Sequence, residues 1–161
     1  MKFFNFHLMP YRHADLDAIE KHGTAWVTYS NRDYDPVKGA ELYHEYLDQM
    51  EFADTLGFDG VCLNEHHQTA YGLMPSPIVT ASALARRTSR VKIAILGSAL
   101  PLRQHPMTVA EEHAMIDVIS GGRLISGLLS SGMARPRIAI FARLTERASA
   151  PASTPGIGIM P

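Results

Sequence analysis

Short apolar runs recur at a fixed spacing along this chain. Runs typical of buried strands begin near residues 59, 91 and 123, so each start lies 32 residues after the one before. That interval fits one strand, one helix and two connections, and such a crossover pairs its strands in parallel. An aromatic-rich run that stops at Pro10 adds a strand at the N-terminus. The pattern predicts four parallel strands near residues 3–9, 59–64, 91–100 and 123–129.

Segments with helical spacing of apolar residues lie between these runs. The most regular begins after Asp35 and Pro36, a capping residue followed by a first-turn proline, and ends before Gly57. We expect helices near residues 37–56, 77–88 and 106–120, and a long loop containing a short helix in residues 11–35. Alternating strands and helices place the chain in the α/β class.

Periodicity alone fits either a doubly wound sheet or a (β/α)8 TIM barrel. No G-x-G-x-x-G follows the first strand, where Met9, Pro10 and Tyr11 stand instead, so the barrel is favoured. A barrel has eight such units in roughly 250 residues. Four strands in 161 residues therefore predict the first half of one.

Composition excludes several classes of function. Hydrophobic residues make up 46% of the chain, which is enough for a sizeable core, and the net charge of -1 gives no reason to expect nucleic acid or a membrane as partner. The single cysteine, Cys62, lies within an expected strand and reads as a small buried side chain. With neither a signal-peptide core nor an apolar run approaching ~18 residues, we expect a cytoplasmic protein.

Polar residues follow the second strand at the point where it ends. Glu65, His66 and His67 come directly after the apolar run and Asn64, and functional residues of α/β folds collect at the C-terminal ends of parallel strands. A neutral imidazole suits taking and returning a proton near pH 7, so His66 is the leading catalytic candidate, with Glu65 orienting it or sharing in the chemistry. A metal cluster is the alternative. Because successive side chains of a strand alternate faces, His66 and His67 would not both point inward, and we expect no metal site.

Three stretches carry a resemblance to a known family. They are Asn64-Glu65-His66-His67 with Tyr71-Gly72-Leu73, residues 94–101 with His105-Pro106, and residues 111–123. Together with the opening residues 2–6, and in this order, they resemble the bacterial luciferase-like monooxygenase family over roughly residues 1–127. The resemblance implies a (β/α)8 flavoprotein, an oxidoreductase that uses FMN, with coenzyme F420 as the alternative cofactor.

The resemblance also assigns roles to residues. It places His66 beside the flavin ring, where it assists oxygen chemistry or acts as a base, and it places Leu96, Gly97 and Ser98 against the ring through the backbone of their strand. Gly97 would permit that close approach, although a bulge glycine in a buried strand is an alternative reading. His7 on the first strand is a further candidate neighbour of the cofactor.

The implied reaction is a monooxygenation of a small organic substrate by O2 and reduced FMN, which a separate flavin reductase supplies. A homodimer or a heterodimer is left open. Two other functions remain: a non-catalytic, truncated half-barrel, and a metal-dependent hydrolase on the same barrel.

The composition changes near residue 133. Residues 133–161 contain six alanines, four prolines and four arginines but one acid, Glu146. We therefore divide the chain into residues 1–132, the N-terminal half of a barrel, and residues 133–161, a disordered or frameshifted tail in which residues 138–144 form at most a short strand or helix. Such a fragment is expected to be inactive by itself.

Overall fold

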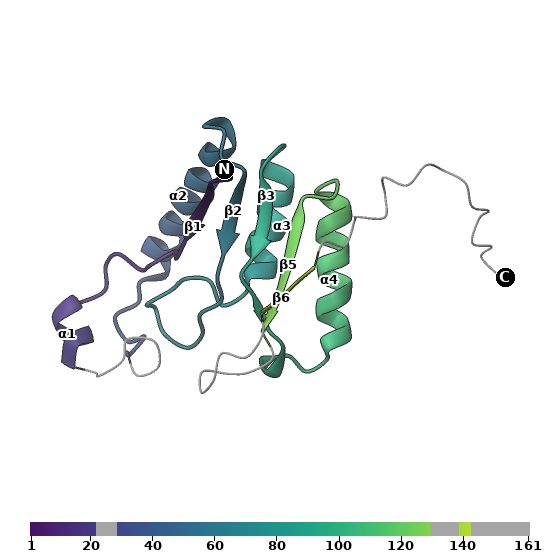
Figure 1. Cartoon of the computed structure of the whole chain (residues 1–161). Helices are drawn as coiled ribbons and strands as arrows, with labels where there is room; N and C mark the ends of the chain where they lie inside the picture. The colour runs from purple at the N-terminus through teal and green to yellow at the C-terminus, as the bar shows by residue number, and fades with distance from the viewer. Residues whose placement is uncertain (22–28, 130–138, 143–161) are drawn as a thin grey trace, which may run out of the picture.

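A computed structural model describes residues 1–21 and 29–129, together with the backbone of residues 139–142. Its strands β1 (Phe4–His7), β2 (Gly60–Leu63), β3 (Lys92–Ile95) and β5 (Leu124–Leu129) lie side by side in that order, and each neighbouring pair is parallel (Figure 1). The parallel pairing of β1 with β2 confirms the expectation on which the α/β assignment depended.

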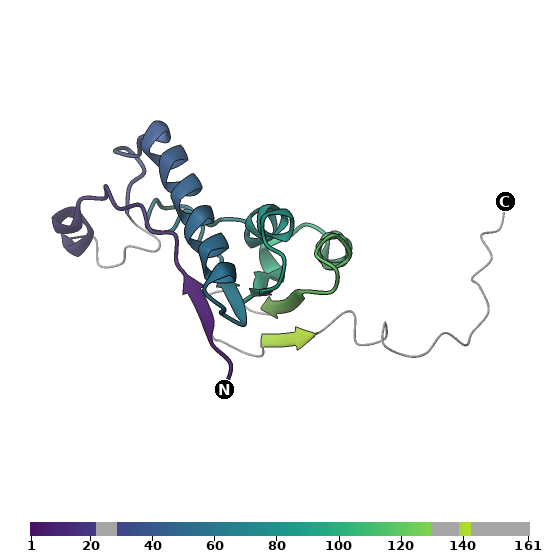
Figure 2. The same cartoon turned by 90° about the horizontal axis from the view of Figure 1, so that it is seen from above.

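Three long helices cover one face of this sheet. They are α2 (Pro36–Thr55), α3 (Pro77–Arg87) and α4 (Pro106–Ile119), and Figure 2 shows all three on the same side of the strands. The side chain of Asp35 accepts hydrogen bonds from the backbone amides of Val37 and Lys38, so α2 begins with the expected cap. The helix bounds lie within a few residues of those that the sequence predicts.

The core lies between the sheet and the helices. Val61, Leu63, Ile93 and Ile95 are fully buried in one hydrophobic cluster with side chains of α2 and α3. Since side chains alternate along a strand, the residues between them point to the opposite face of the sheet. On β1 that opposite face carries Phe6, which remains 52% exposed.

Arg123 joins the end of α3 to the start of β5. Its buried guanidinium donates hydrogen bonds to the carbonyls of Ala85, Thr88, Val91 and Ser120. The carbonyls at a helix C-terminus have no partner within the helix and carry partial negative charge, so a buried cation there satisfies and stabilises them.

The third predicted strand is interrupted. Residues 91–100 form β3 and the short β4 (Ser98–Ala99), which pairs in parallel with the end of β5, and Leu96 and Gly97 separate them. A 3-10 helix at Leu100–Leu102 leads toward α4, and the expected short helix of the first long connection is α1 (Leu16–Lys21). No helix of the described residues is long and apolar enough to cross a membrane.

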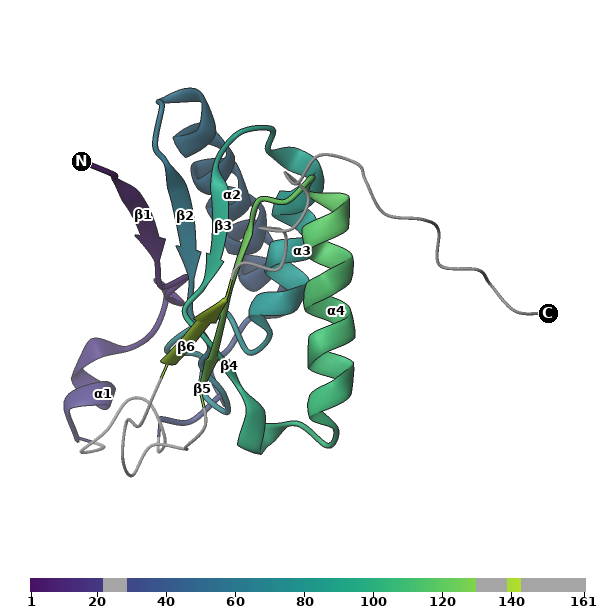
Figure 3. The same ribbon diagram turned by 45° about the vertical axis from the view of Figure 1, so that its right-hand side comes forward.

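Beyond residue 129 the structure describes one further element. This is β6 (Ala139–Ala142), which pairs antiparallel with β5 (Figure 3). It falls where the sequence predicts at most a short strand or helix. The expectation of a poorly ordered tail concerns residues that otherwise lie outside the described ones.

Candidate functional site

The site begins with the loop that follows β2. Its backbone is held at two places: the amide of His66 donates to the carbonyl of Met74 at 3.0 Å, and the amide of Leu73 donates to the carbonyl of Met9 at 2.7 Å. A bridge between Pro10 and Gly72 adds to the second contact. The loop is therefore closed on itself and tied to the end of β1, at the C-terminal edge of the sheet.

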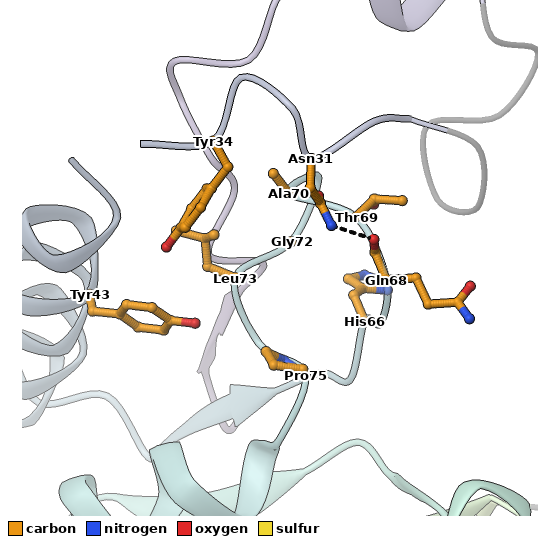
Figure 4. A pocket seen from close by; sticks show the side chains of 10 residues that line it. All are labelled: Asn31, Tyr34, Tyr43, His66, Gln68, Thr69, Ala70, Gly72, Leu73 and Pro75. Atoms are coloured by element: carbon orange, nitrogen blue, oxygen red, sulfur yellow. Dashed lines mark hydrogen bonds between the residues drawn. The ribbon is translucent and has the colours of Figure 1, made fainter. Parts of the chain in front are cut away.

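A pocket of about 260 Å³ lies between this loop, α2 and the connection that precedes α2 (Figure 4). His66 from the loop, Tyr34 from the connection and Tyr43 from α2 contribute three rings to its wall. The amide of Asn31 donates to the carbonyl of Gln68 at 2.7 Å, which ties the connection to the loop. The complete lining is Asn31, Tyr34, Tyr43, His66, Gln68, Thr69, Ala70, Gly72, Leu73 and Pro75.

His66 is confined at the edge of this pocket. An added Cβ on Gly72 would lie 2.8 Å from its Cδ2, and the ring of Tyr71 meets the imidazole edge-on with centroids 5.7 Å apart. Burial, and to a lesser extent the neighbouring His67, lowers the pKa of His66 below its ordinary value of 6.5. His66 is therefore mainly neutral at pH 7 and able to accept a proton.

Glu65 points elsewhere and serves as a hub. Its side chain is 2% exposed, and its carboxylate contacts the Nε2 of His67 at 2.6 Å, the backbone amide of Ala99 at 3.2 Å and the Nη2 of Arg103 at 3.0 Å. These contacts join the loop after β2 to the segment after β4. A carboxylate engaged on both oxygens holds structure, so the geometry favours a positioning role over the catalytic role considered from the sequence.

Ser98 and Gly97 are occupied by the protein itself. Ser98 is fully buried and its Oγ lies 3.1 Å from the Nε2 of His113 on α4, whose Nδ1 lies 2.6 Å from the Oγ of Ser126. A Cβ on Gly97 would lie 3.0 Å from the backbone of Gly127. Gly97 thus permits close approach of a neighbouring strand, the alternative reading of this residue, and the expected backbone contact with a cofactor finds no support here. Leu96, by contrast, is 38% exposed.

His7 also differs from expectation, because it faces α2. Its Nε2 lies 3.0 Å from the side-chain oxygen of Gln49, and its ring packs on Tyr46 at 4.7 Å between centroids. Its Nδ1 accepts a hydrogen bond from the amide of Met9 at 3.0 Å, so the neutral ring carries its proton on Nε2 and donates it to Gln49. His7 supports the end of β1 and is not part of the pocket.

The predicted convergence of Glu65, His66, Gly97 and Ser98 in one pocket is therefore wrong for the described residues. Only His66 lines the pocket. The residues that sequence reasoning missed are Tyr34, Tyr43 and Arg103. Tyr43 had been assigned to the apolar face of its helix, and Tyr34 and Arg103 lie in segments without a regular pattern.

Asn64, between β2 and Glu65, has an unusual environment. The residue is 7% exposed, and neither its Oδ1 nor its Nδ2 has a hydrogen-bond partner among the described residues. Buried amides are nearly always paired, so this one calls for an explanation. Within residues 1–21 and 29–129, no group of three His, Cys, Asp or Glu side chains is placed to hold a metal ion.

Comparison with known proteins supplies the family. The sequence profile of the luciferase-like monooxygenases matches residues 23–140. Limonene 1,2-monooxygenase of Rhodococcus erythropolis is 37% identical over 84 residues, which cover 52% of this chain and 21% of that protein. The oxygenase component of the flavin-dependent trigonelline monooxygenase of Acinetobacter baylyi is 33% identical over 88 residues, covering 55% of this chain and 24% of the relative.

Solved structures agree. The monooxygenase RslO1 from Streptomyces bottropensis superposes with a TM-score of 0.61 at 29% identity, covering 83% of this chain and 34% of that one. The FMN complex of the oxygenating constituent of 3,6-diketocamphane monooxygenase from Pseudomonas putida gives a TM-score of 0.60 at 21% identity, a likeness of fold. The chain spans between a fifth and a third of the length of these relatives. The fold expected from the sequence, the first half of a (β/α)8 barrel, is confirmed, and the chain belongs to the luciferase-like monooxygenase family.

Proposed function

We propose that this chain carries the His66 part of the active site of a flavin-dependent monooxygenase. The observation that supports the proposal best is the placement of His66, from the Glu-His-His run that resembles the family, in the wall of a pocket at the C-terminal edge of the sheet. The pocket suits a planar, uncharged molecule, since its lining contains three rings and no Lys, Arg, Asp or Glu.

Reduced FMN, when bound, supplies the two electrons with which one atom of O2 enters the substrate while the other leaves as water. The protein's part is to position and to move protons. His66 accepts a proton at its free ring nitrogen because burial keeps it neutral. Glu65, through His67 and Arg103, fixes the loop that carries His66. Tyr34 and Tyr43 shield the pocket from water.

The partners follow from this chemistry. A small organic substrate and O2 are consumed, and a separate flavin reductase supplies the reduced cofactor, as the phrase oxygenase component implies for the Acinetobacter relative. FMN is our choice over coenzyme F420 because a solved structure of the same fold holds FMN.

The test is a titration of FMN into the purified 161-residue chain, followed by quenching of flavin fluorescence, with oxygen uptake measured in the presence of a flavin reductase and NADH. We expect saturable quenching. The variant His66→Gln should retain FMN binding within about threefold and lose at least tenfold in the rate of product formation, as removal of a general base does. His44→Gln, on the exposed side of α2, is the matched control and should behave like the unaltered chain.

Absence of quenching at millimolar FMN would reject the proposal and favour a non-catalytic half-barrel. Equal rates for His66→Gln and the unaltered chain would reject the role of His66 alone.

A further inference from the structure

Asn64 stands at the point where the sheet ends and the site begins. It follows Leu63, the last residue of β2, and precedes Glu65 and His66. Leu63 and Val61 point into the helix-covered core, so alternation directs Asn64 to the opposite face of the sheet, the face of Cys62. The side chain is thus on the inner side of the curved sheet, at its C-terminal edge.

The amide of Asn64 is costly to the folded protein as it stands. An asparagine side chain offers two donors and an acceptor with two lone pairs, and its Oδ1 and Nδ2 both lie buried without a partner among the described residues. Such a group loses its hydrogen bonds to water on folding and gains none in return. An apolar residue of the same shape would be more stable, so the amide is explained if it serves a ligand.

The shape of the group indicates what that ligand presents. The carbonyl and the NH2 of an asparagine lie side by side in one plane, and they pair best with a molecule whose own N–H and C=O are adjacent in a ring. The pyrimidine edge of a flavin carries the N3–H between two carbonyls, and the deazaflavin of coenzyme F420 carries the same edge.

We propose that Asn64 binds the pyrimidine edge of the flavin, with Oδ1 accepting from N3–H and Nδ2 donating to an adjacent carbonyl. The inference rests on the proposed function, and it adds a residue that recognises the cofactor independently of the chemistry at His66. Because both ring systems share the edge, Asn64 recognises a flavin-like ring without choosing between FMN and coenzyme F420.

The test compares the unaltered chain with Asn64→Leu, a change that keeps the branched shape and removes both polar atoms. Dissociation constants are measured by fluorescence quenching for FMN and for its N3-methyl derivative, which lacks the N3–H. The unaltered chain should bind FMN at least about tenfold more tightly than Asn64→Leu does, as expected when two buried hydrogen bonds are lost. It should also discriminate against the N3-methyl derivative, whereas Asn64→Leu should bind both flavins with similar affinity.

Thermal unfolding without flavin gives a second readout. If the amide is unpaired, Asn64→Leu should raise the melting temperature by about 2–4 °C. Asn5→Leu is the matched control: the Oδ1 of Asn5 is also buried without a partner in the described structure, but Asn5 pairs with Val61 and so faces the helices. This control should leave flavin affinity unchanged.

Equal FMN affinities for the unaltered chain and Asn64→Leu would overturn the inference and leave the proposed function intact. A lower melting temperature for Asn64→Leu would overturn it as well, because it would show that the amide supports the fold. Failure of the unaltered chain to bind FMN would overturn the proposed function and the inference together.

Discussion

Replacement of Glu65 tests whether this carboxylate positions the site or takes part in the reaction. Glu65→Gln keeps the size of the side chain and removes its charge. One oxygen of Glu65 accepts from both Ala99 and Arg103, and the other contacts His67. A glutamine can turn its oxygen toward Ala99 and Arg103, and His67 can present an unprotonated nitrogen to the new NH2. The hydrogen bonds then survive, and only the charge is lost.

The size of the effect follows from the exposure of the two partners. A hydrogen bond to a charged group contributes about 1.5–3 kcal/mol, compared with about 1 kcal/mol for a neutral one. Glu65→Gln should therefore lower the free energy of unfolding by about 1–2 kcal/mol. Glu65→Ala leaves the cation of Arg103 without its partner, a change that costs about 3–5 kcal/mol when both groups are fully buried. Because the side chain of Arg103 is 23% exposed, we expect about 2–3 kcal/mol.

Urea denaturation followed by circular dichroism measures both changes. A double-mutant cycle with Arg103→Ala should give a coupling of at least about 1 kcal/mol, since the two side chains contact each other. A positioning role also requires that product formation fall together with stability, with Glu65→Gln less affected than Glu65→Ala. Abolished product formation in Glu65→Gln at unchanged stability would refute the reasoning and return Glu65 to a direct part in the chemistry.

Three further outcomes are expected. Arg123→Met should lower the free energy of unfolding by about 3–5 kcal/mol in urea, because it leaves buried carbonyls unpaired, whereas Arg87→Met, which breaks surface ion pairs with Asp48 and Glu51, should cost no more than about 1 kcal/mol. Burial, more than the nearby charge of Arg103, lowers the pKa of His113 below 6.5, so the unfolded chain binds a proton at a pH where the folded chain does not. Stability should therefore be complete above about pH 6.5 and decline at lower pH, and His113→Asn should flatten this decline; an unchanged slope would contradict the buried neutral imidazole. Gly72→Ala should displace the imidazole of His66 and slow product formation while the melting temperature changes by less than about 3 °C, and unaltered turnover would show that the ring is not held as described.

The strands and helices were predictable because they depend on local patterns. Buried apolar runs, the cap at Asp35 and the glycine after α2 are each read within a few residues of sequence, and the 32-residue interval sets the order of the units. The break between β3 and β4 was not predictable in this way. It depends on how closely Gly97 approaches Gly127, two residues that are distant in sequence.

The edge at which the site forms was predictable, but the direction of its side chains was not. Beyond the strand ends the chain turns through Met9 and Gln68, whose φ angles of 49° and 73° are uncommon for residues other than glycine. These turns separate His66 from Glu65 and bring the loop against Tyr43. Simple alternation of faces cannot anticipate them, which is why His7 and Ser98 were assigned to a pocket that they do not reach.

The pairing of β6 with β5 affects how this protein meets other chains. An uncovered strand at the margin of a sheet offers a row of free amides and carbonyls, and such rows recruit strands from neighbouring molecules into aggregates. Here residues Ser126–Leu129 of β5 are paired with β6 along that margin. The partner strand runs antiparallel to the rest of the sheet, so any further parallel strand that is to extend the sheet along this part of β5 must first displace it.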